Sequence, residues 1–324
     1  MIGGHKLNDL PLTIIVLTYQ SEKTLARTLR AARKLTDDLR VVDSYSSDGT
    51  RKIAESFGAQ FVQHEFADYA QQRNWAIENL SHIQPWQLHL DADEELSIEL
   101  VASIAAELAS DSKFDAYFVR RSVVFMGRRL RFGGLGGSYH ARLFRSGFGR
   151  CEARRYDQHF DTSGQHKQLH GELLDHVSSD LSTWTSRHNA WSTAEVTELL
   201  DPSPGAIDSS RKGPIGRARQ RRTWYYKLPP LLRPFVLVAY RYVFRCGFLD
   251  GKEGLIFHML QGFWFRFLID AKVLERRGEE DGRTCLSERT SQSDDMRRPR
   301  RLKDGRLRPV LHDDLRSGPT ADAE

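Results

Sequence analysis

Short apolar segments alternate with helical patterns through the first 120 residues, and this alternation limits the fold more than any other feature of the chain. LTIIVLT (12–18) has the composition of a buried strand, and Leu25, Leu29 and Ala32 fall on one face of a helix expected over 22–33. Further strands are expected at LRVVDS, AQFVQHEF and PWQLHL, with helices in SSDGTRKIAESF and AQQRNWAIENL. Strands alternating with helices of about a dozen residues predict an α/β fold with a parallel sheet covered by helices.

Polar side chains stand at the carboxyl ends of three of these strands. Thr18 and Tyr19 end the first strand, Asp43 ends the second, and Asp91 and Asp93 follow a later one. Ligands of parallel α/β sheets bind outside the carboxyl ends of the strands. We therefore expect these residues to share one site.

The acidic stretch LHLDADEEL (88–96) admits two interpretations. Closely spaced carboxylates such as Asp91 and Asp93 are used by Mg²⁺ or Mn²⁺, whose shell a substrate phosphate then completes. Alternatively, Glu94, Glu95 and Ser97 open a helix that runs to about residue 109, where the helix dipole favours acidic side chains.

Bulk composition favours a reducing compartment. Cys151, Cys246 and Cys285 are odd in number and far apart, which argues against a disulfide framework. The opening MIGGHKLNDLPL lacks an apolar core of signal-peptide length, so a cytoplasmic protein is expected.

A strongly basic and aromatic region occupies residues 209–249, with ten Lys or Arg and no Asp or Glu. Its most apolar part, LLRPFVLVAYRYVF, is interrupted by Arg233, Pro234 and Arg241, so it does not read as a membrane-spanning helix. Basic and aromatic residues together favour a helix lying on an anionic membrane surface. A helix packed on the rest of the protein is the alternative; nucleic-acid binding has no supporting recognition module.

From Arg276 to the end the chain has no aromatic residues, and twelve basic residues nearly balance eleven acidic ones. Such a composition cannot bury enough apolar surface to offset the entropy of ordering the chain. We expect a disordered tail over 276–324.

Four motifs in order resemble the family 2 glycosyltransferases with the GT-A fold: IIVLTYQ, VVDSYSSDGT, QQRNWAI and LHLDADE. The resemblance covers about residues 10–200. Later segments, among them YDQHF and GFLDGKEGLIFHMLQGFWFRFLIDAKVLE, resemble a bacterial subgroup that builds lipopolysaccharide cores, capsules and related polysaccharides.

The resemblance implies a Rossmann-like, nucleotide-sugar-binding GT-A domain over 10–205. The basic and aromatic composition after it predicts a mainly helical membrane-associating extension over 206–275. It implies an inverting transfer of a sugar from a nucleotide-diphosphate donor, with UDP the commonest, to a lipid-linked or lipopolysaccharide acceptor. The absence of the QxxRW signature argues for a non-processive enzyme. Such an enzyme would sit at the cytoplasmic face of the inner membrane.

The resemblance also assigns roles to individual residues. Five residues of the first three motifs, together with Asp91, the first acid of the DxD pair Asp91/Asp93, would contact the nucleotide. They are Thr18, Tyr19, Asp43, Asp48, Arg73 and Asp91. The DxD pair would hold Mg²⁺ or Mn²⁺, with Asp93 the more direct ligand and Asp91 facing ribose or metal. One departure from the family pattern is Gln20, where many members carry Asn.

The general base of an inverting transfer is assigned to Asp157, which matches the position of a catalytic carboxylate in related enzymes. A salt bridge to Arg154 or Arg155 is the structural alternative. Glu152 is the competing base, and His159 is a candidate for binding acceptor or leaving group.

Two further groups of residues, a histidine pair and a set of arginines, are considered as binding sites. His166 and His170 have the i, i+4 spacing that could hold zinc on a helix, without an accompanying HExxH motif. Six arginines are explained equally well as solvated hairpin charges or as contacts to an anionic acceptor, and we assign them no role: Arg120, Arg121, Arg128, Arg129, Arg131 and Arg142.

Two other functions compete with glycosyl transfer. A sugar nucleotidyltransferase would share the nucleotide-binding fold and the acidic metal site, although the basic-aromatic region argues against it. A catalytically silent subunit that binds nucleotide or membrane would not require Asp91, Asp93 and Asp157 together.

Overall fold

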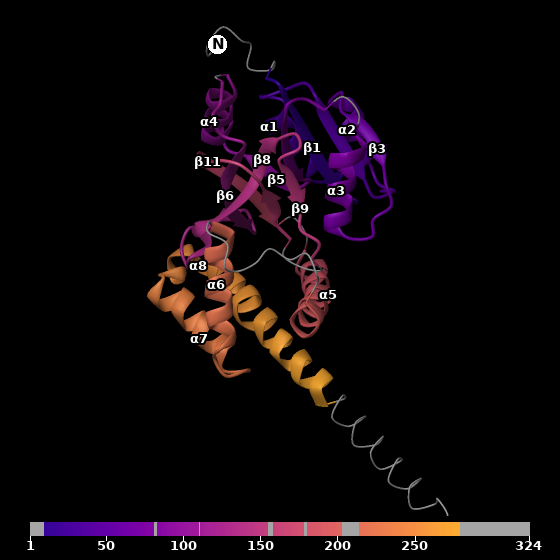
Figure 1. The fold of residues 1–324 in the computed structure, drawn as a ribbon. Coiled ribbons are helices and arrows are strands. Elements are labelled where there is room, and N and C mark those ends of the chain that lie inside the picture. The colour runs from indigo at the N-terminus through magenta and orange to yellow at the C-terminus, as the bar shows by residue number, and fades with distance from the viewer. Residues whose placement is uncertain are drawn as a thin grey trace, which may run out of the picture. The chain divides into compact units, whose positions relative to one another are not determined.

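The computed structural model describes six ranges of the chain, 10–80, 83–109, 111–154, 158–177, 180–202 and 214–278 (Figure 1). The chain divides into two compact units, residues 1–272 and 273–324. The tail expected at 276–324 falls almost wholly outside the described residues, so its disorder stays a prediction.

A parallel half-sheet forms the first part of unit 1. Strands β3 (Gln60–Gln63), β2 (Leu39–Asp43), β1 (Leu12–Thr18) and β4 (Trp86–Asp91) are adjacent in that order, and each neighbouring pair is parallel. Helices α1 (Leu25–Ala32), α2 (Thr50–Ser56) and α3 (Tyr69–Asn79) connect them along the chain. The α/β prediction is confirmed, with every predicted strand and helix of this region present.

Both faces of β1 are covered, and all seven of its residues are buried. On one face Ile14 and Val16 belong to a cluster with Leu29 of α1. On the other face Ile15 belongs to a smaller cluster with Ala76 of α3. Burial on both faces explains why this strand reads as an unbroken apolar run.

Antiparallel pairing extends the sheet beyond β4. Strands β8 (Ser138–Arg145), β6 (Ala116–Phe125), β11 (His166–Val177) and β5 (Glu94–Leu96) follow in order, with β7 (Arg128–Arg129) paired to β6. β8 is antiparallel to β4 and β6, whereas β11 is parallel to β6. The sheet is therefore mixed. The parallel sheet expected from the sequence accounts for its first half only.

The helical extension comprises the α-helices α6 (Pro214–Tyr226), α7 (Arg233–Ala239) and α8 (Gly251–Phe257), and α5 (Leu181–Leu200) precedes it. Between and after them lie the π-helical segments η2 (Tyr240–Phe244) and η4 (His258–Trp264) and the 3-10 helix η3 (Gly247–Asp250). Within unit 1 it packs on the sheet domain. Phe257 lies in a buried cluster with Phe125 and Leu130, and the Asp250 carboxylate accepts hydrogen bonds from the Arg131 and Phe132 backbone (3.1 and 2.9 Å). One face of the extension is thus structural. Among the described residues, no helix combines the length and the apolar character needed to cross a bilayer.

Candidate active site

The ends of β1 and β2 are joined by a buried carboxylate. Thr18 Oγ1 donates to Asp43 Oδ1 (2.8 Å), and the loop after β2 returns Ser46, whose backbone N–H and hydroxyl donate to Asp43 (2.7 and 2.6 Å). Gln63 Nε2 is a fourth donor at 3.4 Å. Asp43 is fully buried. It organises the rim of the predicted nucleotide site, and its contact to a base stays a prediction.

Asp48 ties the same loop to the start of α1. Its carboxylate accepts hydrogen bonds from the backbone N–H groups of Glu22 (3.0 Å) and Thr50 (3.1 Å) and from the Thr50 hydroxyl. Burial raises the pKa of Asp48, but these hydrogen bonds together outweigh it and leave the pKa below its ordinary value. In this structure Asp48 holds the loop in shape, and its predicted nucleotide contact stays untested.

Two arginines hold Asp91 at the end of β4. Arg73 Nη2 of α3 lies 2.6 Å from Asp91 Oδ1, and Arg142 Nη2 of β8 lies 3.1 Å from Asp91 Oδ2. Arg142 also lies 2.6 Å from Glu94 Oε1, while Glu94 Oε2 accepts a hydrogen bond from the Asp91 backbone. Although burial opposes it, the two guanidinium groups hold the pKa of Asp91 well below its usual range.

Asp93 differs from Asp91 in having no hydrogen-bond donor to its carboxylate within the described ranges. Burial, followed by the carboxylates of Asp175, Asp91 and Glu94, raises its pKa well above the usual range. Arg121 is ion-paired with Asp175 of β11 and lies 3.9 Å from Glu94. The electrostatic potential at the Asp93 carboxylate is therefore negative, because the neighbouring carboxylates are not balanced by a donor to Asp93 itself.

The charge balance of this cluster suits a dication. Four carboxylates, Asp91, Asp93, Glu94 and Asp175, face three guanidinium groups, Arg73, Arg121 and Arg142, which leaves one net negative charge when all are ionised. In the described part of the chain, no three His, Cys, Asp or Glu side chains gather closely enough to hold a metal alone. A Mg²⁺ or Mn²⁺ ion held by one or two carboxylates and a substrate diphosphate fits this arrangement.

The helix-cap interpretation is confirmed for Ser97 and for the helix that follows it, but it is wrong for the acidic residues before Ser97. Ser97 caps α4 (Ile98–Leu108), and its side chain accepts the Leu100 N–H (3.2 Å). Asp91 ends β4, Asp93 lies in the turn that follows it, and Glu94 begins β5, so none of them occupies the first turn of the helix.

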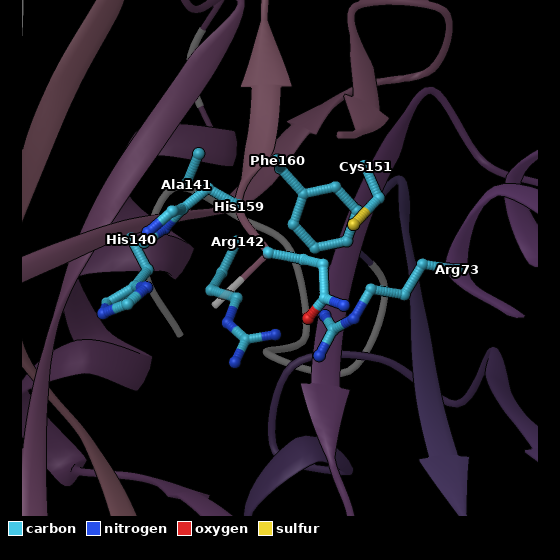
Figure 2. Close-up of a pocket in the computed structure, with 8 residues that line it drawn as sticks. Arg73, His140, Ala141, Arg142, Cys151, His159 and Phe160 are labelled. Carbon is cyan, nitrogen blue, oxygen red and sulfur yellow. The ribbon is translucent and has the colours of Figure 1, made fainter. Parts of the chain in front are cut away.

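A small pocket borders this cluster (Figure 2). Figure 2 shows the guanidinium groups of Arg73 and Arg142 directed into the same space, with the His140 and His159 rings on one side. Cys151, Gln158, Phe160 and Ala141 complete the lining. Burial, the His159 ring and Arg121 lower the pKa of His140 well below its usual range, so its imidazole is neutral at pH 7.

Asp157 lies outside the described residues, together with Arg155 and Tyr156, and its role as base stays a prediction. The ends of its loop are described. Glu152 is buried; its Oε1 accepts the His159 N–H (2.9 Å), and its own N–H donates to the His159 carbonyl (3.0 Å). Asn74 of α3 makes two hydrogen bonds to the Cys151 backbone (2.9 and 2.8 Å). Glu152 therefore closes this loop.

The suggestion that His166 and His170 could hold zinc on a helix is wrong. His166 and His170 both lie in the strand β11, not on a helix, and a register shift follows Gln168 in its pairing with β6. Residues four apart in a strand are about 13 Å apart, which is too far for two ligands of one zinc ion. The His166 ring packs against Phe118 instead.

Sequence reasoning missed Arg142, Arg121, Glu94 and Asp175 as members of the cluster. Arg142 and Arg121 were among arginines that no local pattern separates from ordinary hairpin charges. What brings these residues beside the DxD turn is the pairing of β8 with β4 and of β11 with β5. Pairing between strands distant in sequence is not visible in a single chain.

A mixed α/β sheet with acidic and basic groups at the ends of its strands has the architecture of the GT-A fold. The sequence model of the glycosyl transferase family 2 matches residues 13–176. The chain therefore belongs to glycosyl transferase family 2.

Two curated relatives of the chain are named as glycosyltransferases. The lipopolysaccharide core biosynthesis glycosyltransferase LpsC of Rhizobium meliloti is 24% identical over 281 residues, covering 82% of this chain and 93% of LpsC. An uncharacterized glycosyltransferase of Rickettsia typhi is 31% identical over 118 residues, 36% of this chain; the chain spans only 40% of that relative's length. Among solved structures, S. aureus TarS (residues 1–349) aligns with a TM-score of 0.41 and 12% identity, over 82% of this chain and 91% of TarS.

Proposed function

We propose that this enzyme is an inverting, non-processive, metal-dependent glycosyltransferase of bacterial cell-envelope biogenesis. It moves a sugar from a nucleotide-diphosphate donor, UDP in the first instance, to a lipid-linked or lipopolysaccharide precursor. The observation that carries the proposal is the cluster at the end of β4, where Asp93 has no donor of its own and three further carboxylates surround it. Near-full-length similarity to LpsC, whose name refers to lipopolysaccharide core biosynthesis, supports the class of acceptor.

The residues divide the work between donor and metal. Asp93, with Asp91 beside it, would hold Mg²⁺ or Mn²⁺, which when bound neutralises charge on the departing diphosphate. Arg73 and Arg142 keep Asp91 ionised and in place (2.6 and 3.1 Å). Thr18, Tyr19, Asp43 and Asp48 belong to the rim on which the nucleoside would lie.

The chemical step exchanges one bond at the anomeric carbon for another. The acceptor hydroxyl oxygen attacks from the face opposite the diphosphate, so the configuration inverts as the bond to the diphosphate oxygen breaks. Asp157 takes the hydroxyl proton, and the nucleoside diphosphate leaves with the bonding electron pair. A positioned general base of this kind contributes about 10²–10⁴ in rate.

We expect Asp157→Asn to lower turnover about a hundredfold or more, while nucleotide affinity changes by less than about twofold. Turnover is measured as nucleoside diphosphate released from UDP-, GDP- and dTDP-sugars with an extracted bacterial glycolipid fraction. Glu152→Gln is the comparison variant. Because Glu152 hydrogen-bonds to His159 within its loop, this substitution should lower the stability of the protein as well as its turnover. Full activity in Asp157→Asn would remove that residue as the base.

The nucleotidyltransferase alternative makes a different chemical demand. It would produce pyrophosphate from a nucleoside triphosphate and a sugar phosphate, without a glycolipid acceptor. The same assay therefore distinguishes the two, since diphosphate release that depends on added glycolipid belongs only to glycosyl transfer.

We also propose that the extension binds the anionic cytoplasmic face of the inner membrane. The apolar stripe of α7 and η2 carries this proposal: six exposed residues recur at helical spacing along one outer face, Leu232, Phe235, Val236, Tyr240, Val243 and Phe244. Phe244 is 77% exposed. All charged residues of the surrounding region 209–249 are basic. An exposed apolar stripe flanked by positive charges suits an anionic lipid surface rather than a protein core.

We expect the full chain to float with vesicles containing about one third phosphatidylglycerol and to remain unbound with phosphatidylcholine alone. Phe235→Ser/Phe244→Ser should reduce the bound fraction about tenfold, because two aromatic side chains are lost from the stripe. Met126→Ser, which replaces a 55% exposed residue of the sheet domain, is the control. Equal binding to both lipids, or an unaffected double variant, would contradict the proposal.

A further inference from the structure

The helical extension carries more positive charge than its own acids balance. Residues 214–272 contain eleven Lys or Arg but only three acidic residues. Asp250 accepts hydrogen bonds from the backbone of the sheet domain, and Glu253 lies 3.7 Å from an arginine of β7. Asp270 accepts hydrogen bonds from the guanidinium group of Arg233 (2.9 Å for the Nε donor). These three carboxylates are therefore already engaged.

Arg241, on η2, has no carboxylate partner in the described part of the chain. Burial, followed by the guanidinium groups of Arg266 and Arg221, lowers its pKa to about 10 from the 12.5 of an exposed arginine. Arg221 belongs to α6, and Arg266 to the helix that follows η4. Three helical segments thus bring like charges within reach of one another at Arg241, which folding alone disfavours.

Buried polar atoms lie around the same arginine. Within the described residues, the Tyr225 hydroxyl, both ring nitrogens of His258 and Gln261 Oε1 are buried and have no hydrogen-bond partner. Tyr225 and His258 lie within electrostatic reach of Arg241, and the His258 ring packs on Tyr242, the next residue of η2 (centroids 6.1 Å apart). Buried polar groups of native proteins are nearly always hydrogen-bonded. A ligand is one way to supply that bond.

The position of Arg241 links this cluster to the apolar stripe. Arg241 lies on η2 between Tyr240 and the pair Val243 and Phe244, all three exposed members of the stripe. Arg241 itself is half-buried, so a ligand can reach it. Both η2 and η4 are π-helical and pack against each other, and π-helical turns are frequent at functional sites.

We infer that Arg241, Arg221, Arg266 and the Tyr225 hydroxyl bind the terminal phosphate of a membrane lipid. Guanidinium groups donate paired hydrogen bonds to phosphate oxygens, and a terminal phosphate brings close to two negative charges to a site that has none. A phosphodiester headgroup brings only one. The inference deepens the proposed membrane contact and does not depend on sugar transfer.

The test is calorimetric titration of the full chain, without nucleotide or metal, using dihexanoyl phosphatidic acid below its micellar concentration. Arg241→Gln should raise the Kd about tenfold or more, because charge-assisted hydrogen bonds are lost. Tyr225→Phe should raise it about fivefold. Arg245→Gln removes the same charge from the exposed residue that ends η2, and should keep the Kd within about twofold. Equal losses in the two arginine variants would show diffuse attraction and overturn the inference.

Two other probes identify the ligand. Inorganic phosphate should bind about tenfold or more weakly than the lipid, because it has no acyl chains to contact the stripe. Equal affinity would make free phosphate the ligand and overturn the lipid assignment. Dihexanoyl phosphatidylglycerol, a phosphodiester, should also bind about tenfold more weakly, and equal affinity would overturn the assignment to a terminal phosphate.

Thermal stability separates binding from a structural role. Without lipid, the Tm of Arg241→Gln should stay level or rise, because the substitution removes a buried charge that two arginines repel. Dihexanoyl phosphatidic acid should raise the Tm of the wild type but not of this variant. A lowered Tm together with lost binding would show a structural arginine and overturn the inference. A wild type that floats with phosphatidylglycerol vesicles but binds no phosphatidic acid would overturn the inference alone, leaving the membrane contact and sugar transfer standing.

Discussion

Asp93→Asn should raise the Tm of the protein and abolish sugar transfer, so one substitution is expected to increase stability and remove activity. Burial and the carboxylates of Asp175, Asp91 and Glu94 raise the pKa of Asp93 well above its usual range, so the folded protein disfavours its charge. Asparagine removes that repulsion; each kcal/mol gained corresponds to about 1–2 °C in Tm for a chain of this size. Differential scanning fluorimetry in EDTA measures the gain.

Loss of transfer in the same variant follows from the role of Asp93 as the more direct metal ligand. Losing a bound metal removes several kcal/mol of transition-state stabilisation, so diphosphate release should fall about a thousandfold. Asp111→Asn, at an exposed aspartate of the same domain, should alter neither quantity. A destabilised Asp93→Asn with normal turnover would show that the carboxylate is structural.

We expect Arg142→Met to lower the free energy of unfolding by about 3–5 kcal/mol, because it leaves a buried carboxylate unpaired. Arg142 Nη2 lies 2.6 Å from Glu94 Oε1, and the Glu94 side chain is only 1% exposed. Urea denaturation at pH 7 measures the loss. Arg150→Met is the matched control; its partner Glu78 is 51% exposed, so the expected loss is about 0–1 kcal/mol.

The pH dependence of Arg142→Met has a definite sign. Burial raises the pKa of Glu94 to about 7, above the 4.5 of an exposed glutamate. The folded state therefore binds more protons than the unfolded state between these values, and this group adds stability as the pH falls toward 4.5. The deficit of Arg142→Met should shrink at pH 5, and Glu94→Gln in the same chain should recover most of it. A deficit that is equal at both pH values and in the double variant would exclude this pairing as its cause.

The parallel half of the fold was predictable because its signals are local. Each strand from β1 to β4 is a short apolar run, each connecting helix has its own periodicity, and chain order alone brings the strands side by side. The antiparallel half depends on the insertion of β8 between β4 and β6. The paired residues there are 17 or more positions apart in the sequence. Nothing in one sequence specifies that choice, so only the parallel part, within the first 120 residues, was predicted.

The candidate site divides in the same way. Thr18, Asp43, Asp91 and Asp93 could be placed because they end strands, and the motif resemblance gave Arg73. Arg142 and Asp175 reach the site only through strand pairing.

Calorimetric titration of the full chain with UDP, GDP and dTDP, with and without MnCl₂, tests the central claim most directly. The claim is that the acidic turn at the end of β4 binds a nucleoside diphosphate together with a dication. We predict binding of one of the three nucleotides that requires manganese and disappears in Asp93→Asn. Absence of binding by every nucleotide, with manganese present, would contradict the account and favour a catalytically silent subunit.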